Sequence, residues 1–185
     1  MSLIILNYLL AIFTWISTIT LNVDPPAPKV YPVPPVNENS LFYIQRSKNT
    51  NAIIYEVNRL SDGKINSNDP IKVYWINFAS DSTTSELSII QRKYAYGVSS
   101  KQYNKQKNSF ILQLVAYRKR NIFLLPSGNE KHFIALMNIN GKLVELKRVF
   151  VSISGGTFWF PKVDFIELSG IDPYTKQKTV ERFIP

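Results

Sequence analysis

The chain has 185 residues, no cysteine and a formal net charge of +9 at pH 7. The cysteine count excludes disulfide frameworks, thiolate metal sites and cysteine nucleophiles, and 45% hydrophobic residues are enough for the core of one domain. His132 is the only histidine, and the chain has neither a Gly-x-Ser-x-Gly elbow nor a phosphate-binding glycine loop, so no catalytic residue, metal site or cofactor is predicted.

Residues 1–23 predict an export address rather than part of the fold. Residues 3–21 carry no charged side chain, which is typical of the apolar region of a signal peptide or of a single membrane anchor. The best small-residue pattern for cleavage is Thr18 and Thr20, and a buried helix of a cytosolic protein is a third interpretation. A cleaved signal and an uncleaved N-terminal anchor both predict an exported protein of the periplasm or cell envelope, with the anchor as its only membrane contact.

Residues 24–36 predict a proline-rich tether. Six prolines lie between Pro25 and Pro35, where fixed φ angles and missing amide donors favour an extended chain over a helix or a central strand. A docking peptide for an aromatic-lined groove is the alternative interpretation. The folded unit is therefore expected to begin near Asn37.

Period-two patterns and turn residues dominate residues 37–185, the predicted single β-rich domain. Two apolar segments flank the polar loop SKNTN, as in a β-hairpin, and SDGKINSNDP, NING and DPYTKQ predict turns. Strands are expected at 41–46, 52–58, 71–78, 110–117, 122–125, 132–139, 143–154, 157–160, 163–171 and 179–184.

One segment, at about residues 84–96, departs from the strand pattern. Thr83-x-x-Glu86 has the form of a capping box, and apolar residues then recur at helical spacing until Gly97. Many short strands with one helix predict a mainly β fold, an antiparallel sandwich or barrel with the helix packed on a sheet or closing one end.

The aromatic run in GGTFWFP poses a question about core and surface. Along a strand Phe158 and Phe160 share one face and Trp159 takes the other. Residues 149–153 alternate with the odd-numbered side chains inward, and a bulge or bend at the glycine pair 155–156 would turn both phenylalanines into the core. Trp159 is then either covered by the helix or a loop, or exposed as a residue that stacks on a ligand.

Positive charge is concentrated in the middle of the chain. Between Glu86 and Glu130 lie eight basic residues and no acidic one, and the candidate anion-binding residues among them are Arg92, Lys93, Arg118, Lys119 and Arg120. For an exported protein the accessible polyanions are anionic glycans and lipid head groups, whereas nucleic acid is not expected as a partner. Hydrated surface charge without a specific ligand is the alternative interpretation.

Five separated segments resemble a known family: NSLFYIQRSKNTNAIIYEVN, DGKINSNDPIKVYWI, IQRKYAYG, GGTFWFPKV and GIDPYTKQKTVERFIP. In this order they are similar to the exported bacterial family catalogued as domain of unknown function 4833, over nearly all of the chain from Pro34 onward. The resemblance implies a signal-bearing protein of Bacteroidetes-type bacteria with a compact β-rich domain. It carries over no catalytic residue.

The sequence thus predicts an exported cell-envelope binding or structural module, with anionic glycans or lipid head groups as partners. An envelope hydrolase, with a site assembled from scattered carboxylates, is the alternative, because a spatial site need not show as a linear motif.

Overall fold

The computed structural model describes residues 29–104, 108–128, 132–157 and 160–185. The predicted signal or anchor at residues 1–23 lies outside the described residues. In the described part of the chain, no helix has both the length and the apolar character needed to cross a bilayer.

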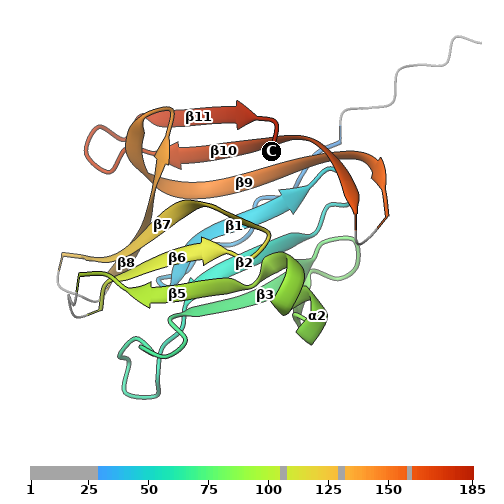
Figure 1. Cartoon of the computed structure of the whole chain (residues 1–185). Helices are drawn as coiled ribbons and strands as arrows, with labels where there is room; N and C mark the ends of the chain where they lie inside the picture. Colours follow the sequence, from blue (N-terminus) through green and yellow to red (C-terminus); the bar gives the residue numbers. More distant parts are fainter. Residues whose placement is uncertain (1–28, 105–107, 129–131, 158–159) are drawn as a thin grey trace, which may run out of the picture.

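The mainly β prediction is confirmed, with one short helical segment (Figure 1). The elements in chain order are β1 (Ser40–Arg46), β2 (Ala52–Val57), β3 (Ile71–Asn77), β4 (Thr83–Glu86), α2 (Ile89–Gln91), the π-helix η1 (Arg92–Tyr96), β5 (Val98–Gln102), β6 (Phe110–Leu114), β7 (Tyr117–Ser127), β8 (His132–Ile139), β9 (Lys142–Gly156), β10 (Pro161–Ile171) and β11 (Lys178–Phe183).

The strands form one sheet that curls into a half-barrel (Figure 1). Its hydrogen-bonded order is β4-β3-β2-β1-β9-β8-β7-β6-β5, with β10 on β9 and β11 on β10. All pairs are antiparallel except β1 with β9, which is parallel. Asn140 and Gly141 join β8 to β9 with φ angles of 51° and 78°, the left-handed conformations that a two-residue hairpin turn requires.

Strand β9 organises the sheet because three strands pair with it. Residues 142–145 pair with β8, and residues 148–151 pair with β1. Glu145 faces Leu136 of β8 and Ile171 of β10, while Val149 faces Ile44 of β1 and Leu168 of β10. Since β10 occupies one edge of β9 from Glu145 to Gly156, β8 and β1 share the opposite edge, one after the other. Two branches of the sheet therefore leave β9 from the same edge.

The helical segment begins later than the sequence predicts. Residues 83–86 are not helical; they form β4 and pair with β3. The capping box is made instead by Ser88, whose side chain accepts from the Gln91 amide while the Gln91 side chain accepts from the Ser88 amide. The spacing of a capping box occurs twice, at Thr83-x-x-Glu86 and at Ser88-x-x-Gln91. The first cannot start the helix because residues 83–86 pair with β3. The prediction of one helix is correct, but its start is wrong.

The strand predictions agree with the structure except at four places, and Thr157 and Phe160, the ends of the strand predicted at 157–160, do not belong to a strand. β4 and β5 were not predicted, because their short, polar, exposed sequences lack the alternation of a half-buried strand. The strand predicted at 110–117 ends at Leu114, where the chain turns into β7.

The inner face of the curled sheet carries the main core. Phe42 stacks on Tyr55 with ring centroids 4.4 Å apart, and buried residues of eight strands belong to the same cluster. Their buried side chains include Ile53, Val73, Leu112, Ile122, Leu124, Ala135, Ile139, Val144 and Leu146. A smaller cluster on the outer face gathers Ala52, Ile54 and Ile76.

The described part of the proline-rich segment lies on the outer face of the sheet. The Pro32 carbonyl accepts a 2.6 Å hydrogen bond from the Gln45 side chain of β1. Tyr31 packs edge-on against Phe150 of β9, with centroids 5.1 Å apart. Residues 29–36 have neither helix nor strand structure, as so many prolines dictate, but they contact the sheet.

Gly170 of β10 is closely packed in the half-barrel, with no room for a larger side chain. A Cβ there would lie 2.5 Å from Cγ2 of Val144, 2.9 Å from the carbonyl oxygen of Glu145 and 3.1 Å from Cδ1 of Ile139. We expect Gly170→Ala to lower the free energy of unfolding by about 1–3 kcal/mol, the usual cost of overpacking. Urea unfolding measures it.

Gly155→Ala is the matched control, because a Cβ at Gly155 meets no atom within 4 Å and its φ is not in the left-handed region. It should change stability by no more than about 0.5 kcal/mol. Equal effects of the two substitutions would contradict the packing described here.

Tyr74 of β3 gives the fold a dependence on alkaline pH. It donates a 2.9 Å hydrogen bond to the carboxylate of Glu56 on β2. Burial, and then the bonded charge of Glu56, raise the pKa of Tyr74 from 10.0 to about 12. Because the folded state keeps the phenol protonated, this stabilisation is complete below pH 10 and is lost as the pH rises toward about 12. We expect the free energy of unfolding of Tyr74→Phe to fall less steeply over this range than that of the wild type.

The measurement is urea unfolding at a series of pH values. Tyr174→Phe is the control, because Tyr174 is 92% exposed, and it should follow the wild-type pH dependence. A Tyr74→Phe curve parallel to the wild type would refute the role given to this pair.

Candidate ligand-binding cavity

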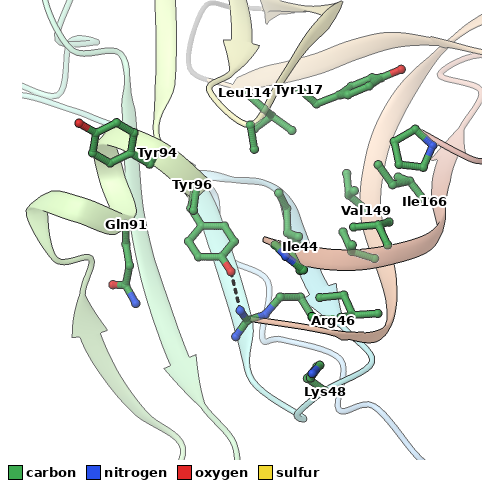
Figure 2. Close-up of a pocket in the computed structure, with 18 of the residues that line it drawn as sticks. Ile44, Arg46, Lys48, Gln91, Tyr94, Tyr96, Leu114, Tyr117, Val149 and Ile166 are labelled. Atoms are coloured by element: carbon green, nitrogen blue, oxygen red, sulfur yellow. Dashed lines mark hydrogen bonds between the residues drawn. The ribbon is translucent and has the colours of Figure 1, made fainter. Parts of the chain in front are cut away.

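A cavity of about 670 Å³ lies inside the half-barrel, between the β9-β10-β11 strands, the inner face of β1 and the helical segment (Figure 2). Its walls are formed largely by aliphatic and aromatic side chains: Ile44, Ile90, Leu114, Met137, Val149, Val151, Ile153, Val163, Ile166, Leu168 and Phe183. Cavities of this size, with such walls, are typical of sites for small apolar molecules.

The alternation of β9 builds one wall, as the sequence predicts. Val149, Val151 and Ile153 point into the cavity, so the odd-numbered residues of this segment are inward. The irregularity predicted at the glycine pair 155–156 lies one residue before it, because Lys162 pairs with Gly155 whereas Val163 pairs with Ile153, which leaves Ser154 as an extra residue in β9.

The prediction that Phe160 packs in the core is wrong. Phe160 is 83% exposed, and its amide and carbonyl both bond to Thr157, at 3.1 Å each. The chain therefore turns at this point instead of continuing as the strand predicted at 157–160. Phe158 and Trp159 lie outside the described residues, and ligand stacking by Trp159 stays a prediction. Gly156, Thr157 and Pro161, which flank them, line the cavity.

The charged side chains that line the cavity are cations: Arg46, Lys48 and Arg120. The guanidinium of Arg46 lies 5.0 Å from the ring centroid of Trp75 and 5.5 Å from that of Tyr96. It also donates a 2.6 Å hydrogen bond to the Tyr96 hydroxyl (Figure 2). None of the ion pairs between described residues involves Arg46 or Lys48.

The helical segment holds Tyr96 beside Arg46. The Tyr55 hydroxyl, fully buried in the core, donates a 2.8 Å hydrogen bond to the Tyr96 carbonyl, and burial raises the pKa of Tyr55 well above its usual value. Trp75 packs edge-on against the Tyr96 ring at 5.2 Å. Burial likewise raises the pKa of Tyr96, so its hydroxyl keeps its proton at neutral pH. The Arg46 end of the cavity is therefore fixed by the core.

Of the five predicted anion-binding residues, Arg120 is the one that lines the cavity. Both terminal nitrogens of Arg120 bond to the Glu181 carboxylate of β11, and the guanidinium lies 4.6 Å from the Phe183 ring centroid. The hydrogen bond from Arg120 lowers the pKa of Glu181. The charge of Arg120 is thus already compensated within the protein.

The other four candidate residues lie on the surface. Arg92 pairs with Glu86 at 3.4 Å, with both side chains well exposed. Lys93 and Lys119 lie 5.2 and 5.9 Å from the ring centroids of the neighbouring Tyr94 and Tyr117, and Arg118 is exposed. The acid-free stretch therefore meets acids from elsewhere in the chain, and the structure does not gather the five residues at the cavity.

Sequence reasoning missed Arg46 and Lys48. A signal for Arg46 was available, since it continues the inward alternation of Phe42 and Ile44 along β1 and an arginine on a core face is unusual. Lys48 follows in the turn after β1 and offers no comparable signal.

Asp and Glu side chains do not contribute to the described lining of the cavity. The carboxyl groups of the described chain that show a pKa shift, Asp62, Asp172 and Glu181, all have pKa values below the usual range, each held there by hydrogen bonds. His132, at the start of β8, is exposed. Within the described ranges, no group of three or more potential ligands among His, Asp and Glu could hold a metal ion.

The model of one protein family, described as Domain of unknown function (DUF4833), matches residues 42–182. The chain belongs to this family. The resemblance seen in five separated segments is thereby confirmed. No curated protein and no solved structure matches the chain.

The Arg120–Glu181 pair should make this DUF4833 domain sensitive to acid. Because the pKa of Glu181 is lowered in the folded state, the stabilisation is present above 4.5, its unperturbed value, and is lost as the pH falls through the lowered pKa. We expect Glu181→Gln to reduce the free energy of unfolding at pH 7 by about 1–3 kcal/mol. The difference from the wild type should shrink as the pH falls below 4.5 and through the lowered pKa of Glu181.

Urea unfolding of the wild type and of Glu181→Gln at pH 7, and at pH values below 4.5, measures the difference in the free energy of unfolding. Glu86→Gln is the matched control, because Glu86 forms an exposed pair with Arg92 and should change stability by at most about 0.5 kcal/mol. The assignment fails if Glu181→Gln and Glu86→Gln are equally mild at pH 7.

Proposed function

We propose that this DUF4833 protein is an exported, non-enzymatic binding module of the cell envelope that holds a lipid-like molecule in its half-barrel cavity. The observation that carries the proposal is the cavity of about 670 Å³, whose walls are aliphatic and aromatic side chains from β1 and β6 to β11. Burial of an apolar chain against such walls supplies the main favourable term in binding.

Lipid is favoured over glycan by the chemistry of these walls. In water, sugar hydroxyls form hydrogen bonds with the solvent. A glycan site needs many polar side chains to take the place of that water, because an unpaired polar group is costly when buried. Here the middle of the cavity is lined by residues such as Val149, Val151 and Ile166, which offer no side-chain partner. The uncharged residues 3–21 support export, and an anionic partner is supported by the cations at the cavity.

The hydrolase alternative receives no support from the site. Glycoside hydrolysis needs two carboxylates that flank the bond, one of them with a raised pKa. The described lining provides neither. The proposal is therefore restricted to binding.

A cavity-filling variant tests the proposal. N-phenylnaphthylamine, a neutral apolar dye, should bind the wild-type protein with enhanced fluorescence and be displaced by dodecanol. We expect Val151→Trp to weaken dye binding by about tenfold or more, since the indole ring would occupy the space of the ligand. Fluorescence titration measures the affinity, and circular dichroism checks the fold.

Leu143→Trp is the control, because Leu143 lies on the same strand, is 52% exposed and does not line the cavity. It should leave dye binding unchanged. Absence of dye binding to the wild type, or equal binding by both variants, would rule out this cavity as the binding site.

A further inference from the structure

The three cations of the cavity differ in how their charge is compensated. Arg120 is paired with Glu181. Arg46 and Lys48 form no ion pair with any described residue. Arg46 also borders a smaller, polar cavity of about 300 Å³ that contains Glu86, but the ion pair of Glu86 is made with Arg92. Uncompensated positive charge is therefore confined to one end of the ligand cavity.

Arg46 is held in place by contacts that leave its charge unneutralised. Its hydrogen-bond partner is the neutral Tyr96 hydroxyl, and its other neighbours are the faces of Trp75 and Tyr96. Its Nε atom is enclosed and donates to no acceptor in the described structure. A guanidinium has five N–H donors, so several are left for a ligand. A partly buried arginine without an anion is costly, and an oxyanion would remove that cost.

The opposite end of the cavity carries no uncompensated charge, because Arg120, which lies there beside Tyr117 and Phe183, is paired with Glu181. Figure 2 shows Arg46 and Lys48 on one side, and Leu114 and Tyr117 on the other, with Val149 and Ile166 along the wall between them. An amphipathic molecule has one polar end and one apolar end. The cavity therefore matches an amphipathic molecule in one orientation, with the polar end at Arg46 and Lys48 and the apolar end at Leu114.

We infer that Arg46 and Lys48 form a subsite for the anionic head group of the ligand, with the apolar chain directed toward Leu114 and Ile166. The inference rests on the proposed function and specifies its ligand class: a single-chain amphiphile with a carboxylate or phosphate head. Arg46 supplies a fixed donor group, and Lys48, exposed in the turn after β1, supplies a second charge at the cavity edge.

Competition against N-phenylnaphthylamine on the full chain tests the subsite. Dodecanoate and dodecyl phosphate present the two head groups, and dodecanol is the neutral reference. We expect Arg46→Met to weaken dodecanoate or dodecyl phosphate by roughly tenfold to hundredfold, the value of a hydrogen bond to a charged group, and to change dodecanol by less than about twofold. The anion whose affinity falls more in Arg46→Met carries the preferred head group.

Arg118→Met is the matched control, because it removes the same charge from an exposed arginine in the basic stretch. It should leave all affinities unchanged. If it weakens the anions as much as Arg46→Met does, the anion site lies in the basic stretch and the inference is wrong. Retained dodecanol binding shows that Arg46→Met is folded. If that variant does not fold, Lys48→Met, with an expected loss of about threefold to tenfold for the anions, decides the question.

The direction of the ligand can be read from Trp75, which lies beside Arg46. In a variant with Trp15→Phe and Trp159→Phe, Trp75 is the one remaining tryptophan of three. Dodecanoate brominated next to its carboxylate should quench Trp75 fluorescence more strongly than dodecanoate brominated at the far end of the chain. Stronger quenching by the far-end bromine would overturn the orientation.

The two proposals can fail separately. If dodecanol and both anions compete equally with the dye, and Arg46→Met changes none of them, the cavity binds apolar chains but the head-group subsite is wrong. If none of the three competes and the dye does not bind, the proposed function itself fails.

Discussion

Strand β9 hydrogen-bonds β8 and then β1 along one edge, antiparallel to the first and parallel to the second, while β10 covers its other edge. A strand can pair with only one neighbour at each point of an edge, so the two branches of the sheet must start from successive positions and diverge. They reach each other again through the helical segment between β4 and β5, the last strands of the two branches. The hollow of the half-barrel follows from this branching.

The branching also divides the interior into a packed part and an open part. Tyr55 and its neighbours fill the space where β1, β2 and β3 face β6, β7 and β8. Beyond Met137 and Val149 the inward residues of the long strands β9 and β10 line the cavity. Because the Tyr55 hydroxyl bonds the Tyr96 carbonyl, the packed part fixes the helical wall of the open part. The position of Arg46 is therefore set by core packing rather than by a surface loop.

Local patterns in the sequence predicted most of the fold. Alternation located nine of the eleven strands and the inward face of residues 149–153, since one buried face imposes a period of two. The helix start was misplaced because Thr83 and Ser88 both offer capping chemistry, and only pairing with β3 distinguishes them. Phe160 was misassigned because a turn after the glycine pair carries it out to solvent. The parallel β1–β9 contact joins residues about a hundred positions apart, which no local pattern contains.

The candidate site shows why a count of charges along the chain is a weak guide to a binding surface. The basic stretch between Glu86 and Glu130 dominates the net charge, yet Arg92 and Arg120 are paired with acids from β4 and β11. Pairing in space lowers the field that a ligand would experience from these residues. Arg46 is an isolated basic residue in the sequence of β1, but it lines a cavity whose described walls contain no Asp or Glu side chain. One arginine held by Trp75 and Tyr96 at an apolar cavity thus gives a more specific basis for anion recognition than the four predicted cations on the surface.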